Sequence, residues 1–190
     1  MIDLTTLDEV TQNIETTDAD INNDLTDRIT DVSHRMQTFM DRNLEQQTYV
    51  EVHDGGGCRI FMENPPINSI TGIIVSTVWD YATGSTIPAS DYLIVNQNWD
   101  IDHLVVWPGG RNAIQVTYIG GYLDATDVSS TLPKDLRGAA TKQVNFEFTN
   151  RKFVGQTSID VADGQINIPE KAFLDSVVAV MKRYRITKLG

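Results

Sequence analysis

The residues that could support metal or nucleophilic chemistry are few in this sequence and lie far apart. The histidines His34, His53 and His103 stand alone, and none has a second ligand at the spacing of a metal site. The single cysteine, Cys58, can form neither a structural zinc site nor an intramolecular disulfide, and we expect it to be a small buried apolar residue. No G-x-S-x-G or comparable nucleophile motif is present. The sequence therefore predicts no metal, no cofactor and no catalytic residue.

Two short segments come closer to a ligand-binding pattern. Residues 54–57, Asp-Gly-Gly-Gly, are glycine-rich like a phosphate loop, but they lack the Gly-Lys-Ser/Thr ending and lead into a predicted strand, so we expect a tight turn. Asp100 and Asp102 are two residues apart, and in a strand both would lie on one face, where they could bind a cation. The alternative is a solvent-facing pair without a ligand, and the pattern favours that alternative.

The charges are distributed unevenly along the chain. The formal net charge is −11, and residues 1–31 hold nine carboxylates against the single cation Arg28. From residue 134 onward the sign reverses, with ten Lys or Arg against six Asp or Glu. A protein that reads DNA sequence or binds DNA tightly is normally basic overall. The composition therefore argues against that class of protein.

Two charged clusters stand out within this distribution. Four acids recur at steps of three to four along a predicted helix: Asp20, Asp24, Asp27 and Asp31. Such a block is typical of a solvated face, but it also suits the wall of a DNA channel, because an acidic surface repels phosphate and lets DNA slide. Four cations lie near the end of the chain: Lys182, Arg183, Arg185 and Lys188. They either complement the dipole of the last helix or dock onto an acidic partner.

The N-terminal part of the chain is predicted to be helical. Thr6 and Glu9 have the capping-box spacing, which indicates a short helix to about residue 13. A second start at residues 17–20 precedes apolar residues at steps of three and four, which predict a helix over 18–43. The members of this stripe are Ile21, Leu25, Ile29, Val32, Met36 and Met40. The stripe is typical of a core or of a contact between subunits.

From residue 47 the apolar period changes from helical to two, which indicates β-strands. Residues 49–52 and 59–62 flank the glycine turn and predict a β-hairpin. Further strands are predicted over residues 70–78, 92–95, 104–106 and 114–118. Short strands with local connections favour a small antiparallel sheet or barrel over a doubly wound sheet.

Two more helices are predicted in the last third of the chain. Pro133 and Asp135 suit the first turn of a helix that extends to about residue 151. Within it, Gly138 and the two alanines that follow would allow the close approach of another backbone. A loop over residues 153–168 then leads to a final helix, which we expect to open at residues 169–170, Pro-Glu.

Together these elements predict an α+β fold: a bundle of about four helices, with a small antiparallel β-sheet or barrel inserted between the second and third helices. We expect residues 1–44 and 126–190 to pack as one helical domain and residues 45–125 to form the β-rich insertion. No apolar run is long enough to span a bilayer, and the first residues have neither the basic nor the apolar region of a signal peptide. We therefore expect that the protein does not associate with a membrane and that it is synthesised in the cytoplasm.

Several segments, in their order along the chain, carry a resemblance to a known family. An acidic helical N-terminus is followed by the turn at residues 53–57, then by Asn-Pro-Pro-Ile-Asn-Ser-Ile at 64–70, and then by Val-Thr-Tyr-Ile-Gly-Gly-Tyr at 116–122. Leu-Pro-Lys-Asp-Leu at 132–136 and a short C-terminal helix complete the series. Each segment is common by itself, but in this order they resemble the head-to-tail connector, or adaptor, family of tailed bacteriophages.

This resemblance implies a structural protein of the phage virion, made in the host cytoplasm and located in the neck, with no enzymatic activity. It implies a homo-oligomeric ring, typically of twelve copies, that binds the portal protein, extends the DNA channel without sequence-specific DNA binding, and attaches the next stopper or tail protein. The cations from Lys182 to Lys188 would then dock on the portal, and the acids from Asp20 to Asp31 would face the channel or solvent. The alternatives are a stopper or tail-completion protein of the same neck, or an enzyme with an unrecognised site.

Overall fold

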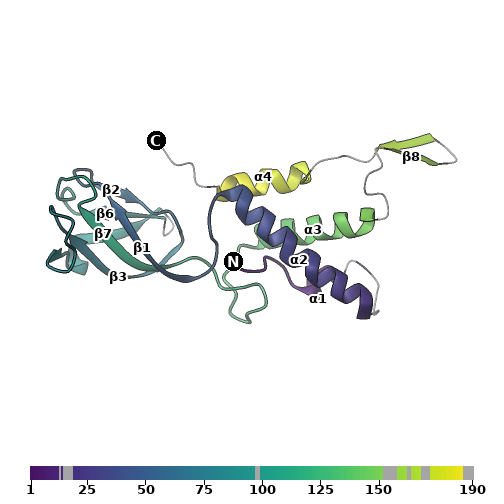
Figure 1. The fold of residues 1–190 in the computed structure, drawn as a ribbon, viewed down its shortest axis with the longest axis horizontal. Coiled ribbons are helices and arrows are strands. Elements are labelled where there is room, and N and C mark those ends of the chain that lie inside the picture. The colour runs from purple at the N-terminus through teal and green to yellow at the C-terminus, as the bar shows by residue number, and fades with distance from the viewer. Residues whose placement is uncertain are drawn as a thin grey trace. The chain divides into compact units, whose positions relative to one another are not determined.

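The computed structural model of this protein describes residues 1–12, 14, 19–96, 99–151, 158–161, 164–167 and 172–185. These residues form four α-helices and nine β-strands, with most of the strands between the second and third helices (Figure 1). The chain divides into two compact units. Met1–Asp41 and Asp124–Gly190 make up the helical unit, and Arg42–Leu123 make up the sheet unit. The predicted α+β class, with a small antiparallel sheet between helices, is confirmed.

The first two helices form as the sequence predicts. Helix α1 (Leu7–Thr11) has a complete capping box, in which Thr6 Oγ1 accepts from the amide of Glu9 at 3.2 Å and the Glu9 carboxylate accepts from the amide of Thr6 at 3.3 Å. Helix α2 (Ala19–Met40) buries the predicted apolar stripe from its second turn onward. The fully or almost fully buried members are Leu25, Ile29, Val32, Met36 and Met40.

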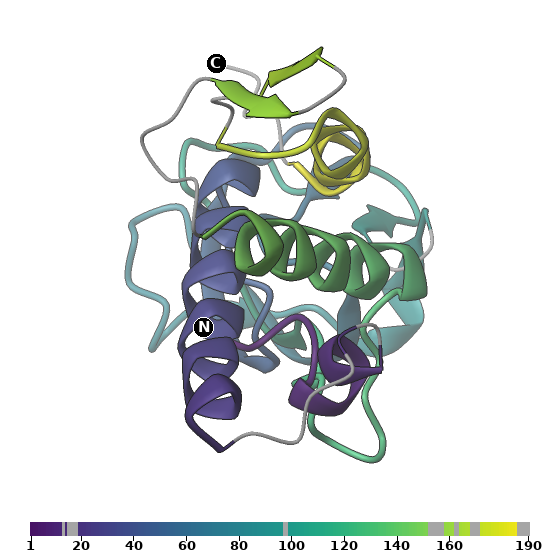
Figure 2. The same ribbon diagram turned by 90° about the vertical axis from the view of Figure 1, so that its right-hand side faces the viewer.

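Helix α3 (Lys134–Asn150) lies at the centre of the helical unit. Pro133 is its N-cap residue, one position before the predicted first turn, and the buried side of the helix packs against α2. The buried residues on this side include Leu136, Ala140, Val144 and Phe148. Figures 1 and 2 show α1 and α4 on opposite sides of α3, and both helices contact it.

The last helix begins later than the sequence indicates. Helix α4 (Asp175–Tyr184) has Leu174 as its N-cap, so a start at residues 169–170 is wrong, and those two residues lie outside the described part of the chain. Val177 and Met181 are its buried residues. Ahead of it, strands β8 (Ser158–Val161) and β9 (Gly164–Asn167) pair antiparallel within a segment that we expected to be only a loop.

The sheet unit contains two antiparallel sheets that share one core. The larger has the order β1 (Gln47–His53), β7 (Ile114–Gly120), β3 (Ile67–Val75) and β4 (Ser85–Thr86). The smaller has the order β2 (Arg59–Phe61), β6 (Asp100–His103) and β5 (Tyr92–Val95), with a short 3-10 helix, Ala89–Asp91, just before β5. Inward residues of both sheets meet in this core, among them Ile60, Ile73, Ile101, Val116 and Tyr118.

The predicted hairpin between residues 49–52 and 59–62 does not form. Strand β1 pairs along its whole length with β7, and β2 pairs with β6. The glycine turn instead packs against another loop, since the amide of Gly55 donates to Gly110 O at 2.8 Å and that of Gly56 to Trp107 O at 2.9 Å. A Cβ atom at Gly55 would lie 1.7 Å from Pro108 O, so this position needs glycine because of the close approach. The glycines mark a contact between loops, not the turn of a hairpin.

The predicted strand over residues 104–106 is also wrong. The nearest strand, β6, ends at His103, and the three residues that follow it are exposed. Their apolar character is therefore not explained by the core of the sheet unit.

Candidate functional site

The residues with catalytic or metal-binding potential do not converge in the structure. Within the described residues, no group of three or more His, Cys, Asp or Glu side chains could hold a metal ion. Cys58 is exposed, which corrects the expectation that it is buried. Across the same residues, none of the helices has the length and apolar character that crossing a membrane requires.

The two aspartates of β6 form ion pairs with an arginine from the neighbouring strand. Asp102 Oδ1 lies 2.6 Å from Arg59 Nε, and Asp100 Oδ2 lies 4.0 Å from Arg59 Nη1. The hydrogen bond from Arg59 lowers the pKa of the Asp102 carboxyl below its ordinary value. Asp100 is buried and also accepts from Asn96 Nδ2 at 2.6 Å. Arg59 therefore takes the place that a bound cation would need, and the pair is structural.

A half-buried polar cluster in the sheet unit was not predicted. The Glu51 carboxylate accepts hydrogen bonds from the Tyr118 hydroxyl, from the amide of Glu63 at 3.0 Å and from Asn64 Nδ2 at 3.1 Å. His53 Nε2 lies 3.3 Å from it. The alternation in the sequence pointed the other way, because it would place Val50 and Val52 inward. In the structure these valines are exposed, and Glu51 and His53 occupy the inward positions of β1.

The electrostatics of this cluster suit a structural role. Burial would raise the pKa of the Glu51 carboxyl, but His53, the Tyr118 hydroxyl and the donors of Glu63 and Asn64 outweigh burial and hold that pKa below its ordinary value of 4.5. Burial and the nearby Glu51 carboxylate raise the pKa of the Tyr118 hydroxyl. The carboxylate stays ionised and ties β1, β7 and the residues after β2 together.

The predicted acidic residues lie on the side of α2 that faces away from its buried stripe. Asp24 pairs with Arg28 at 3.0 Å and Asp31 pairs with Arg35 at 2.9 Å, one turn along the helix in each case. Asp27, between them, is exposed and has no ion-pair partner among the described residues. We call Asp24, Asp27 and Asp31 the acidic face. The side chain of Asp20 lies outside the described part of the structure.

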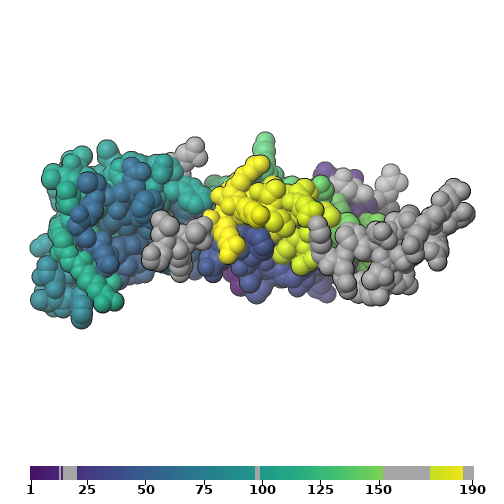
Figure 3. All heavy atoms as spheres, turned by 90° about the horizontal axis from the view of Figure 1, so that it is seen from above, coloured from purple at the N-terminus to yellow at the C-terminus, as the bar shows by residue number. Residues whose placement is uncertain are grey.

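The predicted cations at the C-terminus make contacts within the helical unit. Arg183 Nη1 lies 3.5 Å from Asp135 Oδ2. The same carboxylate accepts a hydrogen bond from the Tyr184 hydroxyl through Asp135 Oδ1 at 2.6 Å. The Arg185 guanidinium lies 5.7 Å from the centre of the Phe39 ring. Lys182 is exposed, and Figure 3 shows α4 at the surface of its unit. Lys188 lies outside the described residues.

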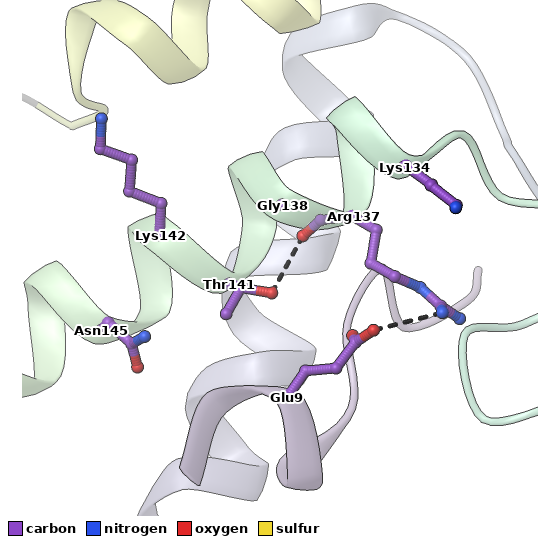
Figure 4. A pocket seen from close by; sticks show the side chains of 7 residues that line it. All are labelled: Glu9, Lys134, Arg137, Gly138, Thr141, Lys142 and Asn145. Carbon is purple, nitrogen blue, oxygen red and sulfur yellow. Dashed lines mark hydrogen bonds and ion pairs between the residues drawn. The ribbon is translucent and has the colours of Figure 1, made fainter. Parts of the chain in front are cut away.

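A groove beside α3 is a feature that sequence reasoning missed. It has a volume of about 590 Å³ and is lined by residues of α1 and α3 (Figure 4). Arg137 is held in it by Glu9, 3.2 Å away, and by the carbonyl of Ala125, to which it donates at 2.7 Å. Lys134 and Lys142 are exposed at the groove, and neither pairs with a carboxylate within the described residues. Three cations against one acid give this groove a positive charge.

Gly138 lies in the lining of this groove. A Cβ atom there would meet no other atom within 4 Å, so nothing in the described helical unit packs closely against it. The predicted close approach of another backbone at Gly138 is therefore wrong for the isolated subunit. The alanines beside it, Ala139 and Ala140, are the ones that are buried.

The sheet unit exposes apolar side chains on loops that are joined by hydrogen bonds. Val78, Trp79 and Val105 are 75%, 64% and 74% exposed. Trp79 Nε1 donates to the carbonyl of Arg111 at 2.9 Å, and Trp107 O accepts from the glycine turn. Exposed aromatic and branched side chains that gather in this way mark contact surfaces in many proteins. Trp107 itself is buried, so of these two tryptophans only Trp79 could be an interface anchor.

Comparisons with known proteins identify the fold. No protein-family model and no curated protein matches the sequence. Solved structures match at a TM-score of 0.52. One is the neck of a native GTA particle computed with C12 symmetry, at 13% identity over 97% of this chain and 90% of that chain.

Two further matches come from particles of the same kind. The neck of an empty GTA particle computed with C6 symmetry matches at 14% identity over 89% of this chain and 81% of that chain. The virion of a native gene transfer agent (GTA) particle matches at 12% identity over 89% and 80%. This chain shares their fold. At such low identity the likeness concerns the fold alone.

Proposed function

We propose that this protein is a structural component of the neck of a phage-like particle, and that it acts there as the head-to-tail adaptor. The observation that carries the proposal is the fold match to a neck chain, which covers 97% of this protein and therefore includes both of its units. The order of sequence segments that resembles the adaptor family supports the same conclusion independently. The proposed role is mechanical and needs no catalytic residue.

In this proposal, copies of the chain form a ring, of twelve in keeping with the C12 symmetry of that neck, around the path of the DNA. A net charge of −11 disfavours tight contact with phosphate, so DNA passes without being held. The ring extends the channel of the portal and carries the next neck or tail protein. The protein is then located in the virion, at the portal vertex.

The two contact surfaces of the ring are assigned by their chemistry. We place the portal contact at the C-terminal cations Lys182, Arg183, Arg185 and Lys188, because Lys182 is exposed and Arg183 is 68% exposed despite its contact with Asp135. We place the contact with the next protein at the exposed loops of the sheet unit that carry Trp79 and Val105. Apolar side chains with this exposure gain most from burial in a partner.

Co-sedimentation with purified portal protein of the same particle tests the role. An adaptor binds the portal directly, whereas a stopper or tail-completion protein, the alternative in the same neck, binds only after the adaptor is in place. We expect direct binding that weakens as salt is raised, because exposed charge pairs are screened. If the protein fails to bind the portal at every salt concentration, and binds only when a separate adaptor is added, it has the stopper role.

A charge-reversal variant tests the portal contact. Reversing Arg183 and Arg185 to Glu and deleting residues 186–190 should abolish portal binding and leave the fold intact, as checked by circular dichroism. If the folded variant still binds the portal as the wild type does, the contact lies elsewhere on the protein.

A further inference from the structure

We propose that neighbouring copies in the ring meet head to tail, with the acidic face of α2 on one copy docked in the α3 groove of the next. The inference rests on the proposed ring, and it names the two surfaces that build it. The partner is thus a second copy of this chain. Each copy presents its acidic face to one neighbour and its groove to the other.

The charges of the two surfaces are complementary. Asp27 is exposed without an ion-pair partner among the described residues, and the same holds for Lys134 and Lys142 at the groove. Lys142 Nζ donates to Ser176 Oγ at 2.9 Å, a neutral group that does not balance its charge. Bringing the acidic face of one copy to the groove of the next would place the unpaired Asp27 against the two lysines.

The dimensions of the two surfaces also agree. From Asp24 to Asp31 the acidic face covers seven residues of helix, about 10.5 Å at 1.5 Å per residue. From Lys134 to Lys142 the groove covers eight residues of α3, about 12 Å by the same measure. The two charged rows can therefore lie alongside each other over about two turns of helix.

Gly138 provides an observation that does not depend on charge. Glycine inside a helix is less favourable than alanine. Neither the packing of the isolated subunit nor its backbone accounts for glycine here, since a Cβ atom would meet open space. A neighbouring helix lying across this position accounts for it, because the missing side chain leaves room for close approach between Lys134 and Lys142.

The placement of the two surfaces suits a ring. Helices α2 and α3 pack through their buried sides. At 100° per residue, the acidic residues lie on the side of α2 opposite its buried stripe, and the groove residues of α3 point away from its buried residues. The two surfaces are therefore on opposite sides of the helix pair. A contact between two different surfaces of this kind is heterologous, and it closes into a ring when the rotation between copies fits.

Cross-linking of paired cysteines tests the contact directly. The full-length chain with Cys58→Ser removes the native thiol, and Asn23→Cys with Asn145→Cys adds one thiol at each surface while Asp27 and Lys142 keep their charges. Treatment with a short bis-maleimide should join successive copies into a ladder of dimers, trimers and larger products. Each single-cysteine variant should give no ladder, because a head-to-tail contact needs both surfaces. The absence of a ladder from the folded double variant overturns the inference.

Charge exchange provides the second test, by native mass spectrometry over a concentration series. Lys142→Glu should raise the concentration needed for assembly at least about tenfold. Adding Asp27→Lys to it should restore assembly. The matched control combines Asp27→Lys with Arg111→Glu, since Arg111 is exposed in the sheet unit and the two doubles have equal net charge. Equal assembly of the two double variants would contradict the proposed pairing.

The outcomes separate this inference from the proposed function. Rings that form without the cross-linked ladder would reject the interface and leave the adaptor proposal in place. A chain that forms no ring even with portal protein, and no ladder, would reject both.

Discussion

The helical unit and the sheet unit differ in what they expose. Of the twelve large apolar side chains that are exposed in the described residues, ten belong to the sheet unit. The helical unit instead presents charges, many of them held in ion pairs such as Arg35 with Glu147 and Arg137 with Glu9. The difference supports the two kinds of contact proposed above. Charged surfaces suit reversible assembly of identical copies that depends on salt, and apolar loops suit a contact that excludes water.

The interiors of the two units differ in the charge of their polar groups. The helical unit buries neutral side chains such as Ser33, Gln37 and Gln143, whereas the sheet unit places the carboxylates of Glu51 and Asp100 at its core. Each unit should therefore respond to its own substitutions and conditions. All three tryptophans, Trp79, Trp99 and Trp107, belong to the sheet unit, so tryptophan fluorescence reports on that unit alone.

The largest expected effect is in the helical core. Leu136 is fully buried in α3, and Leu136→Ala should lower the free energy of unfolding of the helical unit by about 2–5 kcal/mol. Chemical denaturation followed by far-ultraviolet circular dichroism measures the loss. We expect the tryptophan transition of the same variant to stay where it is in the wild type. An equal shift of both transitions would show that the two units unfold together.

A smaller effect is expected from the polar cluster of the sheet unit. Tyr118→Phe removes the hydroxyl that donates to the half-buried Glu51 carboxylate and should lower the free energy of unfolding by about 1–3 kcal/mol. In this variant the denaturation midpoint followed by tryptophan fluorescence should shift, and the unfolding of the helical unit followed by circular dichroism should not. Thr117→Val, on the same strand but facing outward, is the matched control and should change stability little. Equal effects of the two substitutions would mean that the Glu51 cluster is not an anchor.

The contribution of Glu51 to the pH dependence should appear in the sheet unit. Because the pKa of Glu51 is lower in the folded protein than its ordinary value of 4.5, its contribution to stability is fully present above pH 4.5 and is lost as the pH falls through the lower, folded value. Glu51→Gln removes this titration. The difference in stability between wild type and variant should therefore shrink below pH 4.5, as followed by tryptophan fluorescence. A difference that stays constant with pH would show that Glu51 is not ionised in the fold.

The smallest expected effect is a gain in stability. Gly138→Ala should stabilise the isolated helical unit by about 0.5–1 kcal/mol, because alanine is favoured in a helix and the added Cβ atom meets open space. Thermal denaturation followed by circular dichroism measures the gain. If the variant is destabilised, the surface at Gly138 is already covered within the isolated subunit, and the groove is not open.

Local signals explain which elements could be predicted. The capping box at Thr6 and Glu9, the stripe of α2 and the proline before α3 each act within one or two turns of helix, so the sequence alone is sufficient to place them. The start of α4 is an exception, since proline and glutamate at residues 169–170 have the composition of a helix start and the helix begins later.

Strand pairing could not be predicted in the same way. Residues 49–52 and 59–62 are close in sequence and were expected to pair, but Tyr49 lies opposite Tyr118, with ring centres 5.6 Å apart. The strand β7 offers a longer run of inward apolar residues than β2 does, and it is distant in sequence. A pattern of alternation shows that a strand forms. It does not show which strand lies next to it.

The sequence by itself determined the α+β class, the first three helices, the uneven charge and the resemblance to a connector family, because each depends on neighbouring residues or on their order. Only the tertiary structure decided that Arg59 pairs with Asp100 and Asp102, that Glu51 lies among its donors and that Lys134 and Lys142 border a groove at Gly138. These arrangements join residues from different elements. Such contacts arise from the packing of whole helices and sheets, which local propensity does not specify.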